Sequence, residues 1–390
     1  MPLSFATRRR AMGVTLFRQW YEWGFHDNVW HDHDGAVAVR RVGLFIHVFR
    51  RNLGIYAHPG GDLRGGHRVR NGVAQRGKLQ AELPCHRTSN AFCRLALRPL
   101  GRRRDRSQNL TLINYAFAGV ADNLTCASLD TFADWGMSFA ASESVDGIDI
   151  DWEYPGACGA TCNFRADDTQ NLTLLLKEFR DQLDAASPDR HLLLTAATPV
   201  AASYNDTIDL LAISAQLDWM NLMAYDFHGS WEPNGPTYHH TNLYRNPSDP
   251  SMPQLSVHAA VSGYLDNGVS AAKIAIGIPF FGHGWTRVPS PGLYQSAGGL
   301  PRGAWERGVD DYKVLMAKDC PQYWDPIVGA SWLYNGSTFW SFDSPQAVRN
   351  KMHYIAATGL RGVMFWELSG DDGTLVAAIA GCLASSASCP

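Results

Sequence analysis

The stretch that decides the fold is VDGIDIDWEYP, residues 145–155. It carries an acid at every second position, Asp149, Asp151 and Glu153, and large apolar residues at 148, 150 and 152. Side chains alternate between the two faces of a β-strand, so we expect the three carboxylates on one face and the apolar residues on the other. Like charges at this spacing raise one another's pKa. The pattern predicts a buried strand with a chemically active acidic face; the alternative is the solvated face of an edge strand.

The composition changes sharply after residue 107. Residues 1–107 hold 20 Lys and Arg against 7 Asp and Glu, whereas residues 108–390 hold 14 against 30. The basic runs at 8–10 and 101–106 lack the aromatic interleaving, zinc spacing or helix-turn-helix pattern of a nucleic-acid site, so we expect no nucleic-acid partner. Apart from one strand-like run at 42–49, we expect the Arg-rich segment to be poorly ordered. The break favours a wrong start or a shifted reading frame as its origin.

From residue 108 onward, strand-like apolar runs alternate with helical stretches, which is typical of a parallel sheet with crossover helices. One helix is expected over 169–186, with apolar residues at 172, 175, 176, 179 and 183. No glycine-rich phosphate loop follows an early strand, which argues against a doubly wound sheet. Polar residues at the carboxyl ends of the strands instead fit an α/β (β/α)8 barrel, the TIM-type fold. The expected strands cover 112–120, 145–154, 191–198, 219–227, 273–282 and 362–369.

The acidic motif matches the DxxDxDxE signature of family 18 glycoside hydrolases, the chitinase family. The chain resembles that family over residues 108–383. The resemblance implies a catalytic barrel over this range, a small α+β insertion at about 286–340 before the last strand, and a tail at 384–390. Five further segments resemble the family's barrel strands in the same order: NYAF (114–117), TAATP (195–199), MAYDFHGSW (223–231), GIPFFGHGW (277–285) and GVMFWELSGDD (362–372).

The resemblance implies hydrolysis of β-1,4-N-acetylglucosamine linkages in chitin, with the acetamide oxygen of the substrate as the nucleophile. Glu153 at the strand end is then the general acid, and the charge of its neighbours keeps it protonated near neutral pH. Asp151 accepts the acetamide N–H, stabilises the oxazolinium-like intermediate and shares a proton with Asp149. Asp146 is expected to be structural, capping the turn at Gly147.

The resemblance also places substrate contacts at the ends of other strands. The Tyr225 hydroxyl bonds the acetamide oxygen, Asp226 holds the distorted sugar, and Trp366 forms an aromatic floor beneath it. A buried tyrosine and a helix cap are the alternative roles for the first two residues. The remaining expected substrate-binding residues are Met223, Tyr154, Trp231 and Trp285, of which the two tryptophans are either sugar platforms or core residues.

Two features depart from the family pattern. The family usually has Arg, often with Tyr just before it, where this chain has His283 and Phe281, so we expect weaker substrate contacts there. The first and third barrel strands are not recognisable, because only about 27 residues separate NYAF from the acidic motif. We therefore expect an incomplete barrel, with residues 1–107 loosely organised or borrowed to fill the gap. The alternatives to an active enzyme are a non-hydrolytic chitin-binding relative and an inactive fragment of a truncated or misread gene.

Cysteines and glycosylation sequons indicate the secretory route. None of the eight Cys forms a CxxC metal pattern, and Cys158 and Cys162 are expected to form a loop disulfide rather than a zinc site. No signal peptide is recognisable, and no run is long and apolar enough to span a membrane. We expect an extracellular monomer that acts on chitin or chito-oligosaccharides, without a cofactor, metal or membrane partner. The sequons lie at Asn109, Asn123, Asn171, Asn205 and Asn335.

Overall fold

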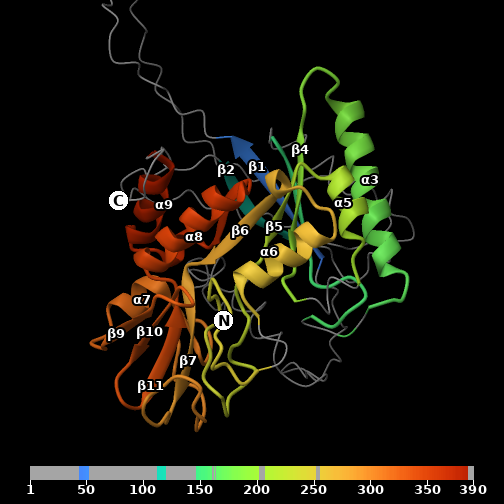
Figure 1. Cartoon of the computed structure of the whole chain (residues 1–390). Coiled ribbons are helices and arrows are strands. Elements are labelled where there is room, and N and C mark those ends of the chain that lie inside the picture. The colour runs from blue at the N-terminus through green and yellow to red at the C-terminus, as the bar shows by residue number, and fades with distance from the viewer. Residues whose placement is uncertain are drawn as a thin grey trace, which may run out of the picture.

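The structure is a computed structural model, in which two sheets and the helices around them can be described (Figure 1). Among the described residues, one sheet has seven strands and the other has five. The larger sheet has helices along its outer side, and the smaller sheet forms a separate layer beyond its lower end in Figure 1. The described residues are 44–51, 112–119, 146–159, 162, 164–201, 207–251 and 255–384.

The larger sheet contains five parallel strands in the order β12-β6-β5-β4-β3. Helices occupy the connections between consecutive strands, as in a (β/α)8 barrel. The predicted TIM-type architecture is thereby confirmed. The parallel strands are β3 (Gly147–Trp152), β4 (Leu193–Thr198), β5 (Trp219–Leu222), β6 (Ile274–Pro279) and β12 (Gly362–Trp366). The main helices are α3 (Asp168–Ala186), α5 (Leu210–Gln216), α6 (Val257–Asp266), α8 (Pro345–Thr358) and α9 (Thr374–Ala384).

A strand from the Arg-rich segment lies beside β3. This strand, β1 (Leu44–Arg51), runs antiparallel between β3 and β2 (Leu112–Gly119). Among the described strands, β2 and β12 are the two edges of the sheet and do not pair with each other. The position next to β3 in the sheet is therefore occupied by an antiparallel strand from residues 1–107 rather than by a parallel strand. The rest of residues 1–107 lies outside the described residues.

The α+β insertion before the last barrel strand is confirmed. Its sheet has the order β8-β7-β11-β10-β9 and is antiparallel throughout. The run at 273–282, expected as one strand, is divided, because β6 ends at Pro279 and the chain crosses to the smaller sheet at Phe281. The elements are β7 (Phe281–Thr286), β8 (Val309–Asp311), α7 (Tyr312–Met316), β9 (Gln322–Asp325), β10 (Ala330–Tyr334) and β11 (Thr338–Phe342).

The alternation of the acidic motif decides which face of β3 is buried against helices. Ile148 and Ile150 belong to the main hydrophobic cluster, together with the inner face of α3. Burying each large apolar side chain contributes roughly 1.5–3 kcal/mol, and a slip of one residue would exchange the two faces. The isoleucines therefore hold the acids on the opposite face. The predicted apolar face of α3 is confirmed, since the buried residues include Leu172, Leu175, Leu176, Phe179 and Leu183.

The ends of α8 illustrate how the sequence sets helix boundaries. The Ser344 hydroxyl accepts a hydrogen bond from Ala347 N at 3.2 Å, and Pro345 occupies the first turn, where no backbone N–H partner is needed. Gly359 ends the helix in the left-handed region at φ 69°, which glycine adopts at little cost. None of the helices in the described ranges has both the length and the apolar character of a membrane span.

Candidate active site

The three acids of the motif lie along the face of β3 that points away from the helices. Asp149 and Asp151 are 2% and 6% exposed, and Glu153 follows directly after the strand end. Asp149 Oδ1 accepts a hydrogen bond from the Thr195 hydroxyl and one from Asn221 Nδ2 at 3.0 Å. Because these two partners lie on β4 and β5, three neighbouring parallel strands converge on one carboxylate.

The environments of Asp151 and Glu153 favour the protonated forms of these two acids. Burial raises the pKa of Asp151 well above its ordinary value, and the charges of Glu153 and Asp149 raise it further. Burial also raises the pKa of Glu153 to about 7, where a hydrogen bond with Tyr154 opposes the shift and the charge of Asp226 adds to it. A carboxyl group with a pKa near 7 has the protonation behaviour that a general acid–base group requires at neutral pH.

The predicted disulfide between Cys158 and Cys162 is present, with 4.2 Å between the two Cα atoms. Its loop packs against the backbone of the catalytic candidate. A Cβ placed on Gly159 would lie 2.2 Å from the Glu153 carbonyl oxygen, so only glycine permits this approach. The disulfide loop thus helps to fix the chain where Glu153 leaves the strand.

Asp146 precedes the strand and has a structural environment. Its carboxylate accepts a hydrogen bond from Arg190 Nη1 at 2.9 Å, and its carbonyl accepts one from Leu193 N at 2.9 Å. These contacts connect the start of β3 to the chain entering β4. Asp146 therefore lies apart from the three acids at the other end of the motif.

Tyr225 lies just beyond β5 in a cluster of large side chains. The Tyr225 hydroxyl is 4.0 Å from Met364 Sδ, and its ring packs edge-on against Phe281 with 5.8 Å between centroids. Gly277 on β6 leaves room for this ring, because a Cβ there would lie 2.6 Å from Tyr225 Cε1. Met223 and Trp366 pack against the same cluster. The structure thus brings together three of the residues expected to contact substrate.

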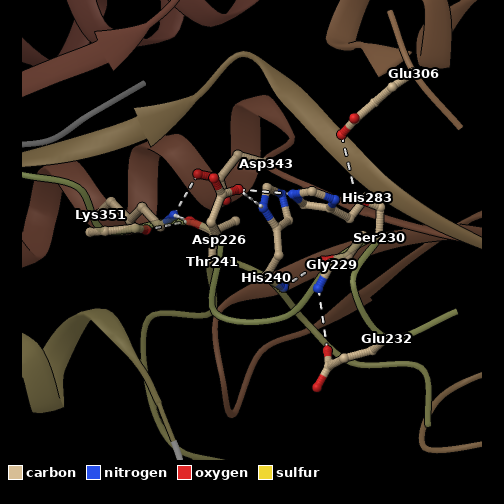
Figure 2. A network of polar contacts seen from close by, with 12 residues as sticks. Asp226, Gly229, Ser230, Glu232, His240, Thr241, His283, Glu306, Asp343 and Lys351 are labelled. Carbon is tan, nitrogen blue, oxygen red and sulfur yellow. Dashed lines mark hydrogen bonds and ion pairs between the residues drawn. The ribbon is translucent and has the colours of Figure 1, made fainter. Parts of the chain in front are cut away.

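Asp226 turns toward two histidines from other segments (Figure 2). Its backbone lies in the left-handed region at φ 59°, which Asp tolerates better than most residues. Asp226 Oδ1 is 2.8 Å from His283 Nε2 and 3.8 Å from His240 Nδ1. Desolvation raises the pKa of Asp226, but the two imidazoles outweigh it and hold the pKa well below its usual range. The carboxylate, whose side chain is 39% exposed, is therefore ionised and open to solvent.

A buried network of Lys351, Asp343 and Thr241 lies next to the segment that carries Tyr225 and Asp226 (Figure 2). Lys351 Nζ on α8 donates hydrogen bonds to Asp343 and to the Thr241 hydroxyl. The Thr241 hydroxyl in turn donates to the carbonyl of Ala224 at 2.8 Å. The Lys351 and Asp343 side chains are both fully buried. The ion pair therefore holds the backbone immediately before Tyr225.

Replacing Lys351 with Met should lower the free energy of unfolding by about 3–5 kcal/mol, because the Asp343 charge is left buried without a partner. Urea denaturation at neutral pH measures this loss. Adding Asp343→Leu to Lys351→Met should restore most of it, since no buried charge then remains. If the single variant is as stable as the wild type, the ion pair does not hold this part of the fold.

The chain is similar in sequence to proteins of a known family. The sequence profile of "Glycosyl hydrolases family 18" matches residues 125–371. The chain belongs to glycosyl hydrolases family 18. Chitinase A1 of Niallia circulans is 38% identical over 265 residues, which cover 63% of this chain and 38% of that protein. Endochitinase 1 of Metarhizium robertsii is 34% identical over 255 residues, which cover 63% of this chain and 57% of that protein.

Solved structures of family 18 proteins share the fold. The catalytic domain of the psychrophilic chitinase B from Arthrobacter TAD20 has a TM-score of 0.60 at 35% identity, covering 63% of this chain and 58% of that one. A Glu-to-Gln mutant of class V chitinase from Nicotiana tobaccum, in complex with NAG4, has a TM-score of 0.59 at 30% identity, covering 66% and 74%. The chain spans less than two thirds of the length of chitinase A1 and of endochitinase 1, the two relatives compared by sequence.

The two tryptophans predicted as sugar platforms differ in environment. Trp231 is 42% exposed, and its ring makes a T-shaped contact with the His283 ring at 5.5 Å between centroids, so part of the side chain faces solvent. Trp285 is 0% exposed, and its Nε1 donates a hydrogen bond to the Glu232 carbonyl at 2.8 Å. Trp285 packs with Phe339 inside the insertion, where no sugar can reach its face. The platform role predicted for Trp285 is therefore corrected to a core role.

Sequence reasoning missed several polar residues of the site. Thr195 and Asn221 interrupt apolar strands with polar side chains, and that interruption was the available signal. His240 lies in a loop with no periodic pattern, so nothing in the sequence places it near Asp226. Glu306 comes from the insertion, where the Ser230 hydroxyl donates to it at 3.4 Å, and burial together with the charge of Asp226 raises its pKa to about 7.

Proposed function

We propose that this family 18 chain hydrolyses β-1,4-N-acetylglucosamine linkages in chitin or chito-oligosaccharides. The observation that carries the proposal is the face of β3 on which Asp149, Asp151 and Glu153 follow one another, with burial raising the pKa of Glu153 to about 7. Family membership supports it, as do relatives named chitinases or endochitinases. The neighbour solved in complex with NAG4 supports an N-acetylglucosamine oligomer as the ligand.

In the proposed mechanism, Glu153 gives its proton to the glycosidic oxygen as the bond to the anomeric carbon breaks. The acetamide oxygen of the same sugar attacks that carbon and forms an oxazolinium-like intermediate. Asp151 accepts the acetamide N–H, while Asp149 shares the proton that two close carboxyl groups cannot both lose. Water then attacks the anomeric carbon and gives a proton back to Glu153, which restores the starting state.

Other residues would bind and distort the reacting sugar. Tyr225 would donate a hydrogen bond from its hydroxyl group to the acetamide oxygen. The ionised, partly exposed Asp226 would accept hydrogen bonds from sugar hydroxyl groups. Trp366 and Trp231 would stack on the C–H faces of sugar rings, as aromatic side chains commonly do. Met223 and Tyr154 would complete the lining.

The pH dependence should report the proton on Glu153. Because this residue must be protonated to act, kcat/KM should be high below its pKa and fall as the pH rises through about 7. A pH–rate profile on a soluble oligosaccharide measures this fall in kcat/KM, which is the alkaline limb of the profile. Glu306→Gln is the matched control, since burial raises the pKa of that residue to the same region. If the limb disappears in Glu306→Gln, it does not belong to Glu153.

Chromophore release from a 4-nitrophenyl chitobioside tests the activity directly, with the corresponding cellobioside as the control. Release from the first and none from the second supports the proposal, because cellobiose lacks the acetamide nucleophile. A chitin pull-down separates the remaining possibilities. Retention on chitin without chromophore release would indicate a non-hydrolytic binding protein, and neither property would indicate an inactive chain.

We further propose that the protein is a secreted, N-glycosylated monomer. The Cys158–Cys162 disulfide supports an oxidising compartment. The Asn335 sequon lies in an exposed turn between β10 and β11, where a glycan has room, and Asn171 lies in α3. Asn109, Asn123 and Asn205 fall outside the described residues. A mobility shift after enzymatic deglycosylation of protein secreted by a eukaryotic host would test this.

A further inference from the structure

Asp226, His240 and His283 lie together, and the proposed hydrolysis gives no role to the two histidines (Figure 2). One carboxylate oxygen and two imidazole nitrogens lie within 4.8 Å of one another. The distances from Asp226 Oδ1 are 2.8 Å to His283 Nε2 and 3.8 Å to His240 Nδ1. Zinc held at 2.0–2.2 Å in a tetrahedral site has ligand atoms about 3.4 Å apart. The two observed distances bracket that value, and the third lies within the 4.8 Å that includes all three atoms.

The lack of hydrogen-bond partners for the His240 ring nitrogens is a second observation, independent of the distances, that indicates a ligand. Its side chain is 0% exposed, and neither ring nitrogen has a hydrogen-bond partner in the part of the chain that the structure describes. Within the same ranges, Nδ1 of His283 also has none. Buried imidazole nitrogens are normally satisfied, so an unsatisfied pair beside a carboxylate requires an explanation. Among the described residues, His240 therefore has no hydrogen bond to break, whereas the hydrogen bond between His283 Nε2 and Asp226 Oδ1 would be replaced by bonds to the ion.

The surroundings allow an ion to enter. Asp226 is 39% exposed, which leaves one side of the group open to solvent. Position 283 is where the family usually carries Arg, and a guanidinium has no lone pair to offer a cation. Here the imidazole completes a set of two nitrogens and one oxygen, a combination that suits zinc and related divalent ions.

We propose that Asp226, His240 and His283 bind one divalent transition-metal ion, with zinc as the natural candidate. The bound ion would also withdraw the Asp226 carboxylate from the sugar and so act as a reversible inhibitor. This second part rests on the proposed function, whereas the binding itself does not.

Binding is tested with Co²⁺, whose visible absorption reports coordination by nitrogen and oxygen without any enzymatic readout. The full chain contains 14 His, so the decisive quantity is the difference between variants rather than the total. His283→Gln and Asp226→Asn should each bind about one Co²⁺ fewer than the wild type and lose the tight phase of the titration. His258→Gln, at an exposed imidazole on α6, is the matched control and should titrate like the wild type.

His240→Gln provides a third variant, and thermal melts identify any variant that is unfolded. Because His283→Gln and Asp226→Asn change partly separate contacts, at least one informative chain should remain folded. Equal Co²⁺ titrations for the wild type and a folded site variant would overturn the binding proposal. For the inhibitory part, Zn²⁺ should lower chitobioside hydrolysis by the wild type, and a chelator should restore it. Equal Zn²⁺ inhibition of wild type and His283→Gln would overturn the assignment of the inhibiting ion to this group.

Discussion

Glu153→Gln should lower the rate of chitobioside hydrolysis by on the order of 10⁴-fold, while the affinity for chitin oligomers changes by no more than about threefold. The reason is that Gln keeps the shape and the polarity of the side chain but carries no transferable proton. Single-turnover rates and oligosaccharide titration by intrinsic tryptophan fluorescence measure the two quantities separately. Loss of binding in proportion to rate would mean that Glu153 positions the site rather than reacting.

The same variant carries an internal control in its stability. Burial raises the pKa of Glu153 to about 7 in the folded chain, so its contribution to stability is fully present below the unfolded value near 4.3 and is lost as pH rises through 7. Gln does not titrate. Glu153→Gln should therefore be more stable than the wild type at pH 8, by at most about 4 kcal/mol, and the difference should shrink toward pH 4. Denaturation at both pH values measures this, and a variant that is less stable at pH 8 would contradict the buried environment assigned to Glu153.

Asp151→Asn should lower kcat/KM by on the order of 10²–10⁴-fold, a loss no larger than that expected for Glu153→Gln. Asn occupies the same volume but cannot carry the negative charge that would stabilise the oxazolinium-like intermediate. The expected loss is mainly in kcat, because the charge matters most after the glycosidic bond begins to break. Steady-state kinetics on a soluble oligosaccharide measures both parameters.

Asp146→Asn is the matched control for that substitution. It removes a carboxylate from the same motif, but Asp146 contacts Arg190 at the start of β3 rather than the acidic array. Its kcat/KM should equal that of the wild type. A wild-type rate for Asp151→Asn, or equal losses for the two variants, would remove Asp151 from the mechanism.

The sequence predicts those parts of the fold that depend on local alternation. Period-two alternation at 148–153 places the acids of β3 correctly, because isoleucines fix the buried face. The 3.6-residue period likewise predicts the inner face of α3, including Leu172 and Phe179. Both results depend on neighbours within one element, which a sequence displays directly.

Features that depend on distant segments could not be predicted in the same way. The antiparallel pairing of β1 with β3 joins residues about 100 positions apart, and its register depends on which edge is free. The local sequence allows Trp285 to be an exposed sugar platform, but in the fold it is buried against Phe339 of β11. His240 reaches Asp226 only because the loop carrying it is held by Thr241 and the buried Lys351. In each case tertiary packing supplies what the local sequence lacks.

The most direct test of the proposed mechanism is proton NMR of a chito-oligosaccharide during the first minutes of hydrolysis by the full chain. If the acetamide oxygen attacks and water then displaces it, the anomeric carbon is inverted twice. The new reducing end should therefore appear first as the β-anomer, with the α-anomer growing later by mutarotation. An α-anomer that appears first would show direct attack by water and would contradict the substrate-assisted role assigned to Asp149, Asp151 and Glu153.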